Sequence, residues 1–138
     1  MRFLSVRPRT VSGSSMGGVG CFFTGVPGLA NVVNTAAIVK SDGFLSISGA
    51  DLDLILNVNL KGAFNVCQSV LPVFERAGKG TIVNIASVAA QRGGGLVGGA
   101  HYAASKGGMV AMTKSIARAY AAQCPDCGPP LDSGVLAM

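Results

Sequence analysis

The strongest constraint on the fold is a long helical pattern placed between two short runs of apolar and β-branched residues. The two runs, residues 31–35 and 81–86, have the length and composition of buried parallel strands. Over about residues 49–77, apolar residues recur at steps of three and four, as in a helix packed on one side: Leu52, Leu56, Leu60, Ala63, Cys67, Val70 and Phe74. Strand, helix and strand in this order predict a βαβ unit with a right-handed crossover, and therefore an α/β fold.

Signals at the ends of the elements support this prediction. Ser48, followed three residues later by Asp51, resembles a capping pair at a helix start, and Gly78 fits the left-handed position just past a helix end. A second helical pattern, over about residues 102–122, follows a glycine-rich loop. We expect a partial, truncated Rossmann-like (doubly wound) parallel sheet, with three layers built around two or three parallel strands and two long helices.

The length of 138 residues corresponds to one domain. Residues 1–27 contain three arginines and no acidic residue, and we interpret them as a poorly ordered basic Ser/Gly-rich segment, with a transit-like leader as the alternative. The glycine run from Gly13 to Gly20 resembles a phosphate-binding loop, but no convincing strand precedes it and no amphipathic helix follows. Residues 28–122 are the predicted core, and residues 123–138 an irregular tail.

Composition limits the classes of function. Charged residues make up 12% of the chain and hydrophobic residues 49%, so a monomer could not easily cover its apolar surface, and we expect a homo-oligomer or a piece of something larger. No uninterrupted apolar run reaches the length of a membrane-spanning helix. The net charge of +5 comes from scattered basic residues without interleaved aromatics, which argues against nucleic-acid binding.

Cysteine spacing gives little support for a metal site. Cys124 and Cys127 form the one CxxC pair, while Cys67 falls within a helical pattern and the single histidine, His101, lies far away in the sequence. We predict no metal site and interpret the thiols as reduced, as in a cytoplasmic protein.

A tyrosine and a lysine mark the start of the second helical pattern. Tyr102 and Lys106 are four residues apart, so both side chains emerge on one face of a helix. A phenol ordinarily titrates near pH 10, and a neighbouring ammonium supplies part of the stabilisation that its anion needs nearer neutral pH. Alone, this spacing favours a packed aromatic residue beside a solvated lysine.

Four motifs in order change that interpretation, because together they resemble the classical short-chain dehydrogenase/reductase family. Asn34-Thr35-Ala36-Ala37 is similar to the NNAG motif after the family's fourth strand, although Thr35 and Ala37 depart from it. Asn59 stands where the family has its helix asparagine, 28 residues before Ser87, and Tyr102 follows Ser87 by 15 residues. The resemblance covers about residues 28–122.

The resemblance implies roles for these residues in a reaction that interconverts a carbonyl and an alcohol with NAD or NADP. Tyr102 would be the general acid or base, Lys106 would assist it and hold the nicotinamide ribose, and Ser87 would donate a hydrogen bond to the substrate oxygen. Asn59 would hold a water in the proton relay behind Lys106. Asn34, Ala36 and Ala37, together with Tyr102 and Lys106, would contact the cofactor.

Two features of the family are missing from their expected places. Family members begin with a strand, a glycine-rich turn and a helix that hold the cofactor's pyrophosphate, and only 20 residues separate Gly13 from Val33. The family also continues past the second helix with a substrate-binding region. The sequence therefore leaves open an alternative function, a catalytically inactive fragment that acts only through a helical dimerisation surface.

Overall fold

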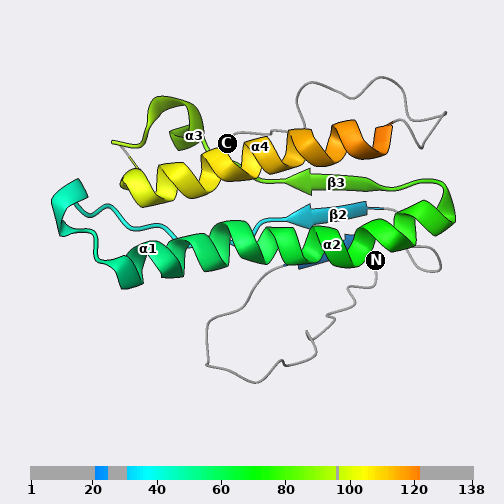
Figure 1. Ribbon diagram of the computed structural model, residues 1–138, viewed down its shortest axis with the longest axis horizontal. Coiled ribbons are helices and arrows are strands. Elements are labelled where there is room, and N and C mark those ends of the chain that lie inside the picture. Colours follow the sequence, from blue (N-terminus) through cyan, green and yellow to red (C-terminus); the bar gives the residue numbers. More distant parts are fainter. Residues whose placement is uncertain (1–20, 25–30, 96, 122–138) are drawn as a thin grey trace.

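The computed structural model describes residues 21–24, 31–95 and 97–121 of the chain. It contains one sheet with the strand order β1 (Cys21–Thr24), β2 (Asn31–Asn34) and β3 (Thr81–Asn84). Strands β2 and β3 are parallel, with Asn34 opposite Asn84. The long helical segment between them completes the predicted βαβ unit, which confirms the α/β class (Figure 1).

Strand β1 departs from the expected all-parallel sheet. It pairs with β2 in the antiparallel direction, with Cys21 opposite Asn34. Six residues separate Thr24 from Asn31, and a crossover to a parallel neighbour needs roughly a dozen residues or more. A strand at this position can therefore join β2 directly only as an antiparallel partner.

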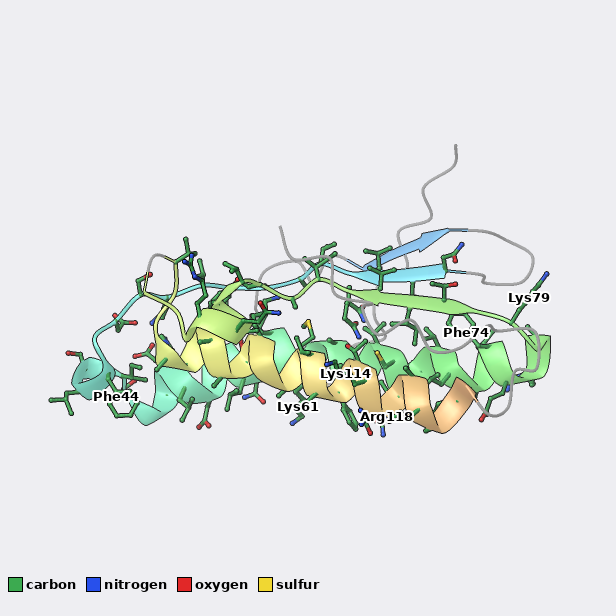
Figure 2. All side chains as sticks on the ribbon, turned by 90° about the horizontal axis from the view of Figure 1, so that it is seen from above. Phe44, Lys61, Phe74, Lys79, Lys114 and Arg118 are labelled. Carbon is green, nitrogen blue, oxygen red and sulfur yellow. The ribbon has the colours of Figure 1, made fainter. Side chains whose placement is uncertain are left out.

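The helices lie on one side of the sheet. The segment between β2 and β3 consists of α1 (Gly49–Leu56), η2 (Asn57–Lys61) and α2 (Gly62–Ala77), and after β3 come α3 (Ala89–Arg92) and α4 (Ala100–Ala121). Helices α2 and α4 both cover the same face of the sheet (Figure 2). The described part thus has two layers and not the three expected, because helices change face where the strand order reverses, and these residues contain one crossover.

A π-helical turn, η2, interrupts the long helix and changes which residues face the core. Ile55 and Asn59 are fully buried, whereas Leu52 is exposed and Leu56 and Leu60 are only half-buried. A π turn holds one more residue than an α turn, so it rotates the preceding helix by about one residue relative to the following one. The predicted stripe is therefore wrong before η2 and correct after it, where the buried positions are Ala63, Cys67, Val70 and Phe74.

Helix α2 is attached to the sheet by a small apolar cluster. Val32 of β2 packs with Val70 and Phe74 of α2, and Val66 and Ile82 border this group. The predicted helix ends are also confirmed: the Ser48 side chain accepts a hydrogen bond from the Asp51 backbone N–H, and Gly78 adopts a left-handed conformation with φ of 66°. Residues 1–20 and 122–138, which include the glycine run Gly13–Gly20 and the Cys124/Cys127 pair, lie outside the described residues.

Gly80, in the turn between α2 and β3, gives a direct test of this packing. A Cβ atom at Gly80 would lie 2.1 Å from the ring of Phe74, which is part of the core cluster. We expect Gly80→Ala to lower the free energy of unfolding by about 1–3 kcal/mol, as overpacking does. Gly49→Ala is the matched control, because a Cβ there meets nothing within 4 Å. Urea denaturation of both variants measures the difference, and equal stabilities would contradict the packing described.

Candidate functional site

Lys106 connects helix α4 to the end of strand β3. Its Nζ donates a 2.7 Å hydrogen bond to the backbone oxygen of Ile85, the residue that follows β3. The side chain is buried, with the whole residue only 2% exposed. Burial lowers the pKa of the Lys106 ammonium below its ordinary value, because the charged form loses hydration.

Tyr102 lies one helical turn before Lys106 and is largely buried. Its ring packs on Gly98 so closely that a Cβ atom there would lie 2.3 Å from the ring, and Gly98 has a φ of 79°. Both the space and the backbone conformation therefore call for glycine. The Tyr102 ring is thus held against the glycine-rich loop that precedes α4.

Ser87 follows Ile85 by two residues, so the hydrogen bond of Lys106 to Ile85 lies beside the segment that carries the serine. The Ser87 side chain is half-buried, and its Oγ accepts a 3.2 Å hydrogen bond from the backbone N–H of Ala89 at the start of α3. An oxygen used as an acceptor keeps its own O–H as a donor. Ser87 can therefore donate to a ligand oxygen while its position is fixed.

Asn59 lies in the π turn and is fully buried. Its Oδ1 accepts from the Ile38 backbone N–H at 2.8 Å and its Nδ2 donates to the Ile38 backbone oxygen at 2.9 Å. The same Nδ2 donates to the Ser105 hydroxyl at 3.1 Å, and Ser105 donates to the backbone oxygen of Tyr102 at 2.7 Å. Asn59 thus joins the segment after β2 to the turn of α4 between Tyr102 and Lys106. Its predicted role as a water holder stays a prediction.

The three residues predicted from the NNAG-like motif differ in their surroundings. The Asn34 side chain is buried and donates a 2.7 Å hydrogen bond to Asn84 Oδ1, so it links β2 to β3. Ala36 is half-buried and Ala37 exposed, just past the carboxyl end of β2, where ligands bind in open α/β sheets. Asn34 therefore supports this end of the sheet, whereas the two alanines present only small side chains just past it.

Several polar residues of this region have no motif that predicts them. Asn84 donates to the Thr113 hydroxyl at 2.8 Å, and Thr113 in turn donates to the Met109 backbone oxygen at 2.8 Å. This chain of contacts ties β3 to α4. A buried asparagine inside an apolar strand run is a signal that sequence reasoning could have used, because a buried amide must find hydrogen-bond partners.

Two classes of site are absent from the described segments. Within residues 21–24, 31–95 and 97–121, no three histidine, cysteine or acidic side chains come together in a way that could hold a metal ion. Over the same ranges, no helix combines the length and apolar character needed to cross a membrane.

Comparison with known proteins identifies the family. The model of the short chain dehydrogenase family matches residues 22–124, well over half of the chain. The chain belongs to this short-chain dehydrogenase family. A solved structure of a short-chain dehydrogenase/reductase from Burkholderia xenovorans has a similar fold, with a TM-score of 0.65 and 38% identity, over 69% of this chain and 37% of that one. The predicted Rossmann-like class is thereby confirmed.

Curated short-chain dehydrogenase relatives agree with this placement. An uncharacterised short-chain type dehydrogenase/reductase of Sinorhizobium fredii is 42% identical over 67% of this chain and 37% of its own length. The 3-oxoacyl-[acyl-carrier-protein] reductase FabG of Thermotoga maritima is 41% identical over 63% of this chain, and an acetoacetyl-CoA reductase of Synechocystis 42% identical over the same share. The chain spans just over a third of the length of these relatives. Their names indicate enzymes and give the alternative of an inactive helical protein no support.

Burial of Lys106 makes the stability of this short-chain dehydrogenase fold depend on pH. Because the folded state lowers the pKa of Lys106, it binds fewer protons than the unfolded state between that lowered value and the ordinary value of 10.5. Stability therefore rises with pH through this window. We expect the unfolding free energy of the wild type, relative to Lys106→Met, to increase as pH is raised from neutral toward 10.5. Urea denaturation of both proteins at several pH values tests this, and a stability difference between them that does not change with pH would contradict it.

Proposed function

We propose that this chain provides the catalytic part of an oxidoreductase that transfers a hydride between a nicotinamide cofactor, NAD or NADP, and a small carbonyl or alcohol substrate. The observation that carries this proposal is the placement of Tyr102 and Lys106 on one face of α4, with Lys106 hydrogen-bonded to Ile85 at the base of the segment that holds Ser87. This arrangement supports a site at the end of β3 in which a phenol, an ammonium and a hydroxyl act together. The relatives named as reductases support the same class of reaction.

The residues present fit a nicotinamide ribose. The Lys106 ammonium has three N–H donors, of which one is directed to Ile85, so donor capacity remains for ribose hydroxyls. Ala36 and Ala37 place small side chains at the neighbouring end of β2. When bound, the nicotinamide supplies or accepts the hydride.

The protein's own groups handle the proton and the charge on the substrate oxygen. In reduction, the Tyr102 hydroxyl gives its proton to the oxygen as charge develops there, and in oxidation the phenolate takes that proton back. The Ser87 O–H donates to the same oxygen and stabilises its negative charge. The Lys106 ammonium stabilises the phenolate, and its effect is strengthened because burial excludes water from around the charge.

A tyrosine pair provides the test. Tyr102→Phe keeps the ring against Gly98 but removes the proton, so we expect turnover to fall by about 10²–10⁴-fold while binding of NADH or NADPH, followed by nicotinamide fluorescence, is kept. Tyr120→Phe, on the same helix, is the control and should retain full activity. Equal turnover in both variants would show that Tyr102 is not the proton donor. Failure of the wild type to bind either dinucleotide would favour the inactive alternative.

We also propose that the chain self-associates through its long helices, in the cytoplasm. A shallow groove runs along α1, η2 and α2, lined mainly by apolar atoms of Leu56, Leu60 and Phe64, with Asp53, Asn57, Lys61 and Asn65 at its edges. Phe64 is 45% exposed in the single chain, which is unfavourable for a large aromatic residue. A second copy of the helices would cover this surface. The Cys67 side chain is buried and accepts a 3.8 Å hydrogen bond from Asn34 Nδ2, and a buried reduced thiol of this kind suits a reducing compartment.

An exchange of Phe64 tests the helical interface. We expect the wild type to elute as a discrete dimer or tetramer in size-exclusion chromatography with light scattering, and Phe64→Ser to shift it toward the monomer. Phe44→Ser is the matched control, because Phe44 is 77% exposed on the turn before α1, away from this groove. A monodisperse wild-type monomer would refute the interface. Polydisperse material would instead point to association through open sheet edges.

A further inference from the structure

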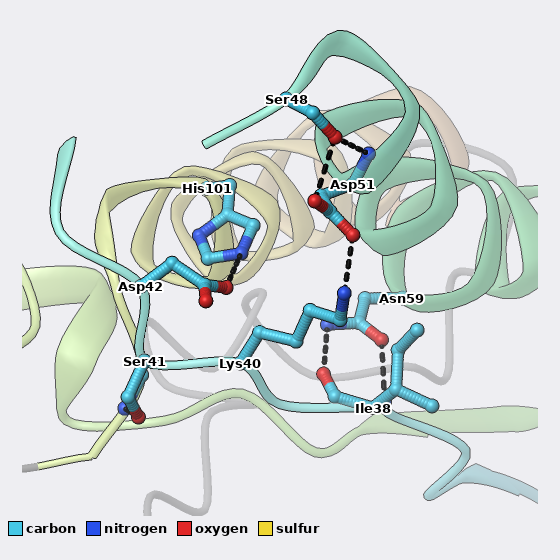
Figure 3. A network of polar contacts seen from close by, with 9 residues as sticks. Ile38, Lys40, Ser41, Asp42, Ser48, Asp51, Asn59 and His101 are labelled. Atoms are coloured by element: carbon cyan, nitrogen blue, oxygen red, sulfur yellow. Dashed lines mark hydrogen bonds and ion pairs between the residues drawn. The ribbon is translucent and has the colours of Figure 1, made fainter. Parts of the chain in front are cut away.

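The imidazole of His101 is buried and has no hydrogen-bond partner in the part of the chain that the structure describes. His101 is the second residue of α4 and is 2% exposed, and neither of its ring nitrogens has a partner among the described residues. Buried polar atoms are nearly always paired, because an unpaired one loses the hydrogen bonds it makes with water. Asp42 lies just out of reach: its Oδ2 is 3.7 Å from His101 Nε2 (Figure 3).

The segment that carries Asp42 is held to three other elements. The Asn59 side chain of the π turn hydrogen-bonds both the backbone N–H and the backbone oxygen of Ile38. Asp51 of α1 forms an ion pair with the Lys40 side chain. From the loop before α4, the Gly99 N–H donates to the Lys40 backbone oxygen at 2.7 Å, and the Gly98 N–H donates to Ser41 Oγ at 3.2 Å. Residues 38–41 are thus fixed in place. The Asp42 side chain, 44% exposed, comes directly after these contacts.

We infer that His101 and Asp42 form a proton-dependent latch between the segment after β2 and the start of α4. A neutral imidazole has one donor and one acceptor nitrogen, whereas the protonated ring donates from both. Protonation of His101 therefore turns the 3.7 Å contact into an attraction between opposite charges, and a rotation of the Asp42 side chain shortens it to a charge-assisted hydrogen bond of about 2.8 Å. Without that proton the ring carries no charge, and the attraction to the carboxylate is lost.

The charged groups around His101 come from the segment after β2. The Asp42 carboxylate faces the ring, with Oδ2 3.7 Å from Nε2, and the ring lies at the start of α4. Lys40 carries the opposing charge of the loop, but it is engaged with Asp51, whose contact raises the pKa of Lys40 and lowers that of Asp51. The titratable residues next along the helix are Tyr102 and Lys106. Asp42 is therefore the group whose removal should change the proton affinity of the ring.

The position of the latch links pH to the geometry of the candidate site. His101 directly precedes Tyr102, and the Asp42 segment continues from Ala36 and Ala37 at the end of β2. Closing the latch therefore joins these two sides through one more side-chain contact. This inference goes beyond the proposed oxidoreductase function and does not depend on it, because the latch requires neither cofactor nor turnover.

Proton NMR of the complete chain tests the latch directly. His101 is the single histidine of the sequence, so its ring signals are identified without assignment. We expect the midpoint of its titration to fall by about half a pH unit or more in Asp42→Asn, because the variant loses the favourable charge. Glu75→Gln, which removes an exposed carboxylate of α2 outside the groove, is the control and should leave the midpoint unchanged. Identical midpoints in the wild type and Asp42→Asn would overturn the inference.

A second readout in the wild type separates a latch from a charge that acts alone. The backbone amides of Gly98 and Gly99 bond to the Asp42 segment, so their chemical shifts should follow the same midpoint as the His101 ring. In His101→Gln this pH dependence should disappear. Glycine amides that ignore the histidine titration in the wild type would overturn the proposal, whether or not either variant folds.

Discussion

The buried amide of Asn59 is the contact on which the rest of this structure depends. It makes three hydrogen bonds, two to the backbone of Ile38 and one to Ser105. Because an amide buried without partners is costly, the π turn, the segment after β2 and helix α4 can adopt only arrangements that satisfy it. One side chain thereby fixes the relative positions of three segments that are far apart in the sequence.

Small residues of α4 lie where this helix meets its two neighbouring elements. A Cβ atom at Gly108 would lie 2.9 Å from the end of the Leu60 side chain, and one at Gly107 would lie 3.9 Å from the Ala90 backbone oxygen, an ordinary contact distance. Helix α4 therefore packs against η2 on one side and α3 on the other. The small residues of this helix thus face both neighbours at contact distance.

Sequence patterns predicted the elements well where a single periodicity holds and less well where it changes. The strands β2 and β3 and the helix α4 follow from apolar runs and spacing, and Ser48 and Gly78 mark helix ends that the structure confirms. The π turn was not predictable, because the apolar residues around Asn59 fit an unbroken α-helix equally well. The antiparallel strand β1 was not predicted either, because a short run within a Ser/Gly-rich segment carries no periodic signal.

The polar surroundings of the site were the least predictable part, and they also depart most from what stability alone would favour. Motif spacing indicated Tyr102, Lys106 and Ser87, but it does not predict that a carbonyl holds the lysine. Nor does it predict a buried histidine whose ring nitrogens find no partner among the described residues. Both residues lie in the first two turns of α4, beside the end of β3. A fold selected only for stability would place apolar side chains at such buried positions, since each charged or unpaired group there costs free energy. Two such exceptions within five residues of each other mark this end of the helix as the part of the molecule shaped by chemistry and not by packing.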